Sequence, residues 1–358
     1  MLNNHQYIKI NLGNIQKNYL KLKSTINSKK TICSAVVKAN AYGLGIIQIT
    51  QALNDAGCKD FWVTNLEEAY LVKGNSQKSR IYIFQGVNSE EELAIIEENN
   101  FIPVISDKTQ LELINLHSKK RLNIILNFDT GIGRDGFQME EIELLNLIKC
   151  EVLFVMSHLS CSEQKDHFLN IKQLKDFNFL KNFFPDSKFT FANSGGIFLG
   201  SEYHFDMVRP GGALYGVNVS KDKNSQMLNV VEFYASVLNR KVFYKNQYVG
   251  YNATYQAKKG DKVLILNIGY YDGYKRILSN QSTVYAKGFI LPVIGIISMN
   301  MIAIDANKLP ESIFMEIKSI ELIGEKITIG EIAELARTDQ REILTSLSTN
   351  CRKIYTLI

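Results

Sequence analysis

The stretch that decides the fold runs from residue 32 to residue 45, and it reads Ile32-Cys33-Ser34-Ala35-Val36-Val37-Lys38-Ala39-Asn40-Ala41-Tyr42-Gly43-Leu44-Gly45. Its first six residues are small or apolar, which is typical of a buried strand. A lysine follows directly, in a loop of small residues. Burial at a strand end lowers the pKa of an amine and makes it a nucleophile that can form a Schiff base with an aldehyde. Taken alone, however, a lysine at a strand end is more often an ordinary surface residue.

Seven further apolar runs follow, and helical patterns alternate with them. The expected strands cover residues 32–37, 61–64, 81–84, 102–105, 122–128, 152–156, 189–192 and 205–208, and the clearest helical patterns cover 46–56, 90–98, 139–149 and 168–183. Strands that alternate with helices predict parallel pairing, and eight such units predict an α/β fold of the closed (β/α)8 barrel type. A doubly wound open sheet is the alternative, but residues 42–45 do not supply its Gly-x-Gly-x-x-Gly turn.

After about residue 225 the pattern changes to strands joined by short turns. These strands are expected at 234–244, 262–268, 282–286, 290–297 and 302–304, and they predict a mainly antiparallel β domain. A late helix at 329–337 has Thr328 as its candidate N-cap. We therefore expect a barrel domain at 1–225 and a β domain at 226–358, with the first strand, 7–12, able to pair with the second domain.

Composition excludes several classes of protein. The 358 residues are 46% hydrophobic and 22% charged, with a net charge of +5 and no long basic run, which does not favour a nucleic-acid partner. The five cysteines are widely spaced and contain no C-x-x-C pair, which predicts free thiols and no metal site. The chain shows neither a signal peptide nor an apolar run long enough to span a membrane, so we expect a cytoplasmic protein.

Active sites of such barrels lie at the carboxyl ends of the strands. These ends carry Lys38 after the first strand, Asp129 and Arg134 after the fifth, His158 after the sixth, Asn193-Ser194-Gly195-Gly196 after the seventh and Arg209-Pro210-Gly211-Gly212 after the eighth. The last two loops are expected to open into helices, and their backbone N–H groups and hydroxyl suit a phosphate. Either glycine pair alone would be an ordinary turn, but both occupy the usual phosphate position of the fold.

A Schiff-base lysine facing a phosphate loop suggests pyridoxal phosphate. An aspartate commonly protonates the ring nitrogen of this cofactor, whereas the candidate here is Arg209, which donates a hydrogen bond but keeps its proton. A neutral ring favours proton exchange at Cα over decarboxylation or elimination. Exchange on both faces needs a second base, and the tyrosines of 251–255 and 268–274 are candidates if His158 and Arg209 supply positive charge nearby. Each of these tyrosines could instead pack between strands.

The sequence resembles alanine racemase, a pyridoxal phosphate enzyme of fold type III, along nearly its whole length. The matching segments are 36–45, 129–134, 157–158, 193–194, 208–216, 250–251, 268–276 and 297–300. The resemblance implies that Lys38 binds the cofactor and acts as the base on D-alanine, and that Tyr251 acts on L-alanine from the other subunit of a homodimer. It also implies a phosphate site at Tyr42, Ser194, Gly211 and Gly212, a further cofactor contact at Asn193, and a network of His158 and Arg209 that tunes Tyr251. The substrate carboxylate would be bound by Arg134 and the Met299 backbone.

The sequence departs from the family pattern at four positions. Leu44 replaces a histidine, Asn127 replaces a lysine that is carbamylated in many members, Asn300 replaces an aspartate, and Thr349 replaces a phosphate-binding tyrosine. Substrate breadth is therefore open, and a broader-specificity racemase is one alternative. A related decarboxylase would carry an acid in place of Arg209. A non-catalytic carrier of the cofactor would need neither Tyr251 nor the second domain.

Overall fold

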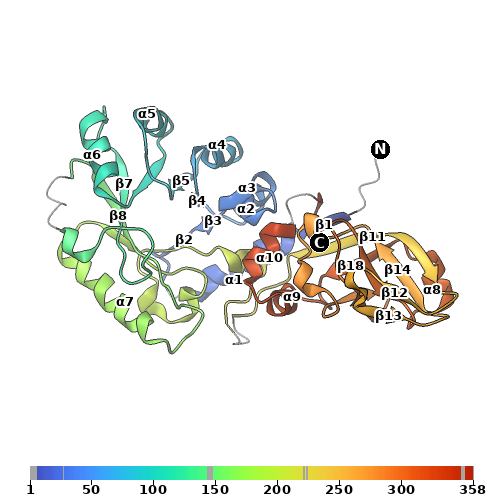
Figure 1. Ribbon diagram of the computed structural model, residues 1–358. Helices are drawn as coiled ribbons and strands as arrows, with labels where there is room; N and C mark the ends of the chain where they lie inside the picture. The colour runs from blue at the N-terminus through green and yellow to red at the C-terminus, as the bar shows by residue number, and fades with distance from the viewer. Residues whose placement is uncertain are drawn as a thin grey trace.

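A computed structural model describes residues 6–26, 28–142, 148–220, 222, 225–347 and 351–357. The chain forms a parallel barrel and a mainly antiparallel β part, which lie side by side (Figure 1). The barrel strands are β2 (Ile32–Cys33), β3 (Ala35–Val36), β4 (Asp60–Val63), β5 (Arg80–Ile83), β6 (Ile102–Ile105), β7 (Asn123–Asn127), β8 (Glu151–Met156), β9 (Lys188–Thr190) and β10 (Met207–Val208). The predicted fold class is confirmed.

The first predicted strand is the one that closes the barrel. It is split at Ser34 into β2 and β3, which correct the single strand expected at 32–37. β2 pairs with β10 and β3 pairs with β4, each in parallel. The backbone N–H of Ser34 donates to Val208 O at 3.1 Å, and that of Val36 donates to Pro210 O at 2.9 Å. One run of sequence thus joins both edges of the sheet, which leaves no open edge there.

Helices cover the outside of the barrel. They are α1 (Leu12–Thr25), α3 (Ile46–Asp55), α4 (Leu66–Asn75), α5 (Glu90–Asn99), α6 (Lys108–His117) and α7 (Phe168–Phe179), and α7 continues as η2 (Leu180–Asn182). The sequence analysis did not single out α1, α4 and α6. Their side-chain N-caps, Asn11, Asn65 and Asp107, each accept a hydrogen bond from the backbone three residues on. The helix expected at 139–149 falls partly outside the described residues.

The second part is built on a sheet whose order is β14-β17-β16-β15-β18-β11-β1-β19, with an added β14–β11 pairing. Its strands are β1 (Gln6–Asn11), β11 (Val231–Val242), β14 (Lys262–Leu266), β15 (Thr283–Ala286), β16 (Phe289–Ile294), β17 (Ile302–Asp305), β18 (Ser319–Ile323) and β19 (Arg352–Thr356). β1 pairs antiparallel with β11 and parallel with β19. The amino-terminal strand therefore belongs to this sheet. A separate hairpin is formed by β12 (Gln247–Val249) and β13 (Tyr255–Ala257).

Three helices complete this part: α8 (Glu311–Glu316), α9 (Ile329–Leu335) and α10 (Gln340–Leu347). Thr328 caps α9 as predicted, since its side chain accepts from the backbone N–H of Glu331 and the Glu331 carboxylate accepts from that of Thr328. α10 runs back toward the barrel and lies between the two parts (Figure 1). Among the helices that the structure describes, none is long and apolar enough to cross a membrane.

Candidate active site

The lysine of the opening stretch begins a turn with unusual backbone geometry. α2 (Lys38–Tyr42) contains four consecutive left-handed residues, Ala39, Asn40, Ala41 and Tyr42, with φ between 52° and 55°. A non-glycine residue costs about 1–2 kcal/mol in this conformation. Such a run persists only where the surroundings hold it, and it is typical of a functional site.

Glu68 on α4 holds this turn. One of its carboxylate oxygens accepts from the backbone N–H of Asn40 and the other from that of Thr64, both at 2.8 Å. The side chain of Asn40 in turn accepts from the N–H of Ile46 at 2.8 Å, which ties the turn to the start of α3. The turn that follows Lys38 is therefore held to both α4 and α3.

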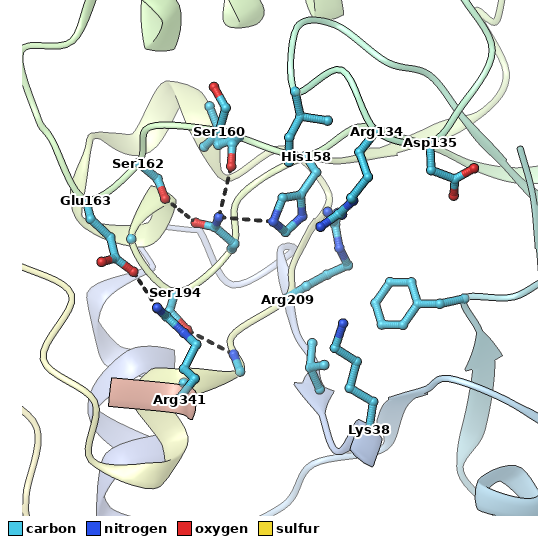
Figure 2. A pocket seen from close by; sticks show the side chains of 18 of the residues that line it. Lys38, Arg134, Asp135, His158, Ser160, Ser162, Glu163, Ser194, Arg209 and Arg341 are labelled. Atoms are coloured by element: carbon cyan, nitrogen blue, oxygen red, sulfur yellow. Dashed lines mark hydrogen bonds and ion pairs between the residues drawn. The ribbon is translucent and has the colours of Figure 1, made fainter. Parts of the chain in front are cut away.

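The Lys38 amine points into a cavity of about 750 Å³ at the carboxyl ends of the barrel strands. Its Nζ lies 5.3 Å from the centre of the Phe84 ring. Burial lowers the pKa of Lys38, and the positive charge of Arg134 lowers it further, against an opposing effect of Glu68. Both causes favour the neutral, nucleophilic amine. Figure 2 shows the Lys38 side chain directed toward Arg209 and Arg134.

The loops after β9 and β10 meet across from this lysine. Ser194 Oγ is buried and accepts from the backbone N–H groups of Gly211 at 2.9 Å and Ala213 at 3.2 Å. A Cβ on Gly211 would collide with the Tyr42 hydroxyl, and one on Gly212 would lie 2.8 Å from Arg341 Nε. A side chain at either position would have to displace one of these polar groups, so glycine lets them approach the backbone closely. The helices expected to open here are only the short 3-10 turns η3 (Gly196–Phe198) and η5 (Gly212–Tyr215).

Tyr42 and Arg209 both line this cavity. The Tyr42 ring packs on Tyr215 with centroids 4.5 Å apart. Arg209 is 3% exposed and donates from Nη1 to Thr190 Oγ1 and from Nη2 to Ser157 O, both at 2.7 Å. Burial lowers the pKa of Arg209 to about 9, so the guanidinium stays charged at neutral pH.

His158 is a neutral member of this group. Burial and the positive charges of Arg209 and Arg134 lower its pKa to about 3. Asn193 Nδ2 lies 3.4 Å from His158 Nε2, which suits an imidazole that accepts at this nitrogen. Asn193 Oδ1 accepts from Ser162 Oγ at 2.8 Å and from the Gly196 N–H at 3.0 Å. His158 therefore does not supply the positive charge that the sequence analysis expected from it, and of these two residues only Arg209 would supply it.

The loop after β7 carries Arg134 to the cavity, and Asp129 organises it. The Asp129 carboxylate accepts from the backbone N–H groups of Gly131, Ile132 and Arg134 at 2.8–2.9 Å. Partial burial opposes ionisation of Asp129, but these N–H groups outweigh it and lower its pKa. Asn127 supports the loop, since its Nδ2 donates to Asp135 O at 3.1 Å.

Two predicted site residues lie apart from this cavity within one chain. Tyr251 is in the short turn η7 (Tyr251–Ala253), which connects β12 to β13, and is 66% exposed. Met299 lies between β16 and β17 and is 53% exposed. Neither residue lines the cavity, so the chain by itself does not bring them to Lys38.

The cavity also holds residues that the sequence analysis missed, notably Glu163 after β8 and Arg341 on α10. No local pattern marked either one, because they meet only through the packing of α10 against the barrel. Of the departures from the family pattern, Leu44 is fully buried and its carbonyl accepts from Tyr355 Oη at 2.9 Å. Asn300 is exposed, and Thr349 lies outside the described residues.

Comparisons with known proteins agree with this geometry. Residues 10–219 match the family model of the alanine racemase N-terminal domain, and residues 230–355 match that of the C-terminal domain. Among curated relatives, an alanine racemase of Rickettsia canadensis is 38% identical over 97% of this chain and 98% of its own length. A catabolic alanine racemase of Agrobacterium fabrum is 35% identical over 98% of this chain and 92% of its own length.

Solved structures give the same result. The alanine racemase of Bartonella henselae, solved with covalently bound pyridoxal phosphate, is 35% identical and superimposes with a TM-score of 0.91 over 98% of this chain and 99% of its own. The biosynthetic alanine racemase of Pseudomonas aeruginosa is 27% identical, with a TM-score of 0.89 over 99% of each chain.

Proposed function

Since the chain belongs to the alanine racemase family, we propose that it interconverts L-alanine and D-alanine with pyridoxal phosphate, by proton exchange between two bases. The observation that carries this proposal is the meeting, in one cavity, of the Lys38 amine, the glycine loop at Ser194 and Gly211, and the buried Arg209.

The residues of the cavity fit this cofactor. The Ser194 oxygen already accepts from two backbone N–H groups, so its own hydrogen is left to donate to a phosphate. The Tyr42 hydroxyl lies against Gly211 and adds a second neutral donor. Lys38 would bind the aldehyde carbon, and Arg209 would donate to the ring nitrogen. When bound, the cofactor supplies an electron sink that acidifies the Cα–H of an attached amino acid.

The chain's own residues would then bind the substrate and move its proton. Arg134 would bind the alanine carboxylate, on a loop that Asp129 keeps rigid. Lys38 Nζ, once displaced, would take or return the proton on one face of Cα, and its lowered pKa suits that role at neutral pH. Arg209 keeps its proton and cannot protonate the ring, which favours return of the proton to Cα over other reactions. A related decarboxylase would carry an acid in place of Arg209, so this site does not match that class of enzyme.

The second base and the substrate-binding backbone would come from a second copy of the chain. Tyr251 and Met299 are exposed and lie away from the cavity of their own chain. A homodimer that places them over the partner's cavity would complete the site, with Tyr251 Oη exchanging the proton on the face opposite Lys38. We propose the domain limits 1–225 and 226–358 for this arrangement. The family-model matches at 10–219 and 230–355 support them, and β1 joins the second sheet.

We further propose that the protein works in the cytoplasm and supplies D-alanine for the peptidoglycan of a bacterial cell wall. The five cysteines support this location, because all are free thiols, as is usual in a reducing compartment. The curated relatives include one named as a catabolic alanine racemase, so growth of a D-alanine auxotroph carrying this chain is the direct test of the biosynthetic role.

The reaction is tested by incubating L-alanine with the purified protein in heavy water. The expected product is D-alanine with deuterium at Cα. Tyr251→Phe should abolish exchange that starts from L-alanine, whereas Tyr244→Phe, which alters another exposed tyrosine, should not. Undiminished racemisation by Tyr251→Phe would refute the two-base mechanism, and no exchange by the wild type would refute the reaction. A panel of other amino acids would define the substrate breadth.

A further inference from the structure

Arg341 brings a positive charge from the second part of the molecule to the phosphate loop of the barrel. It lies on α10, and its guanidinium occupies the space where a side chain at Gly212 would begin. A Cβ at Gly212 would be 2.8 Å from Arg341 Nε and 3.3 Å from Nη2. Figure 2 shows the Arg341 side chain beside Ser194, whose hydroxyl oxygen accepts from the same loop.

Two carboxylates hold this guanidinium in place. Nη2 pairs with Glu163 from the loop after β8, and Nη1 donates to Asp339 at 2.8 Å. The Arg341 side chain is 30% exposed, so it is partly withdrawn from water. Neither bond uses Nε, which is the nitrogen nearest the Gly212 position. The side chain is thus oriented before any ligand arrives, which limits the entropy lost on binding.

The donors already assigned to the phosphate are all neutral. They are the Ser194 and Tyr42 hydroxyls and the backbone of the glycine loop, while His158 is neutral as well. A phosphate ester carries nearly two negative charges at pH 7, and burying it without a counter-charge is costly. Among the described cations of the cavity, Arg341 is the one that contacts this loop, and its charge opposes the rise that burial causes in the pKa of Tyr42.

We propose that Arg341 is a cofactor-binding residue that donates from its guanidinium to the phosphate ester, so that the second part of the molecule completes the phosphate site of the barrel. This inference rests on the proposed function, which supplies the cofactor. A planar guanidinium fixed by two carboxylates is suited to phosphate oxygens. The alternative role for Arg341 is an ion pair with Glu163 that only ties α10 to the barrel.

The two roles are separated by comparing pyridoxal phosphate with pyridoxal, which lacks the phosphate. Purified holoenzyme is dialysed against graded concentrations of either compound, and bound cofactor is read from the visible absorbance of the lysine-linked chromophore. Arg341→Gln should weaken pyridoxal phosphate binding by about 10- to 100-fold, the usual effect of losing a charged hydrogen bond. Its affinity for pyridoxal should not change.

Glu163→Gln is the matched control. It breaks the same ion pair but leaves the guanidinium in place through Asp339, so pyridoxal phosphate binding should be unchanged or tighter. This inference alone would be overturned if Arg341→Gln weakened the binding of both compounds equally or of neither. It would also be overturned if Glu163→Gln weakened pyridoxal phosphate binding as much as Arg341→Gln does. A wild type without the chromophore would overturn the cofactor assignment as well, and the heavy-water experiment tests racemisation independently.

Discussion

The left-handed turn after Lys38 can be tested by replacing alanine with glycine at two positions. The free energy of unfolding should rise at one position and fall at the other. Ala39 has φ 53° and ψ 49°, and its methyl group is exposed. Replacement by glycine therefore removes the strain without opening a cavity. Ala94 lies in the middle of the ordinary helix α5 and is also exposed, so Ala94→Gly makes the same chemical change in a right-handed context.

The magnitudes follow from the two backbones. The left-handed backbone strains a folded alanine by about 1–2 kcal/mol. A glycine avoids this strain, but it loses about 0.5–1 kcal/mol more conformational entropy on folding than alanine does. Ala39→Gly should therefore raise the free energy of unfolding by about 0.5–1 kcal/mol. In the helix there is no strain to relieve, so Ala94→Gly should lower the free energy of unfolding by about 1 kcal/mol.

Equilibrium urea denaturation of cofactor-free protein measures both effects without a contribution from ligand binding. Trp62 is the single tryptophan of the sequence, is fully buried on β4 and stacks on Tyr82, so its fluorescence reports unfolding of the barrel. If Ala39→Gly is as destabilising as Ala94→Gly, the turn stores no strain and the reasoning fails.

Three further outcomes are expected. Asp129→Asn loosens the Arg134 loop, so KM for alanine should rise about 10-fold in steady-state assays while the visible absorbance of bound cofactor stays constant. An unchanged KM would argue against that role. Ser194→Ala leaves two buried N–H groups without their acceptor and should lower the free energy of unfolding by about 2 kcal/mol, measured in urea. In the folded protein the pKa of His158 is lowered to about 3, so this side chain stays neutral at pH values at which the same histidine takes up a proton in the unfolded chain. Stability should therefore fall by about 1.4 kcal/mol per pH unit as pH drops from about 6.5 toward 3. His158→Asn should show a shallower fall in parallel titrations, and identical slopes would refute this assignment.

The sequence was informative wherever burial follows a local period. Alternating apolar runs predicted the parallel barrel, and the Thr328 cap predicted the start of α9. Short polar caps such as Asn65 and Asp107 could have revealed α4, whose apolar periodicity is weak, and α6. Position at a strand end also predicted that Lys38, Ser194 and Arg209 lie in one site, because parallel strands end at one edge.

The order and spacing of residues along the chain specify the barrel and the polar side chains that directly follow its strands. Three other features depend on tertiary packing. Ser34 splits the first strand so that it pairs on both sides, Glu68 holds a left-handed turn at Lys38, and α10 carries Arg341 to the glycine loop and to Glu163. Each depends on groups that are distant in sequence or on a backbone conformation that local preference opposes. These three features are fixed by packing of the whole chain, which no periodic pattern in the sequence predicts.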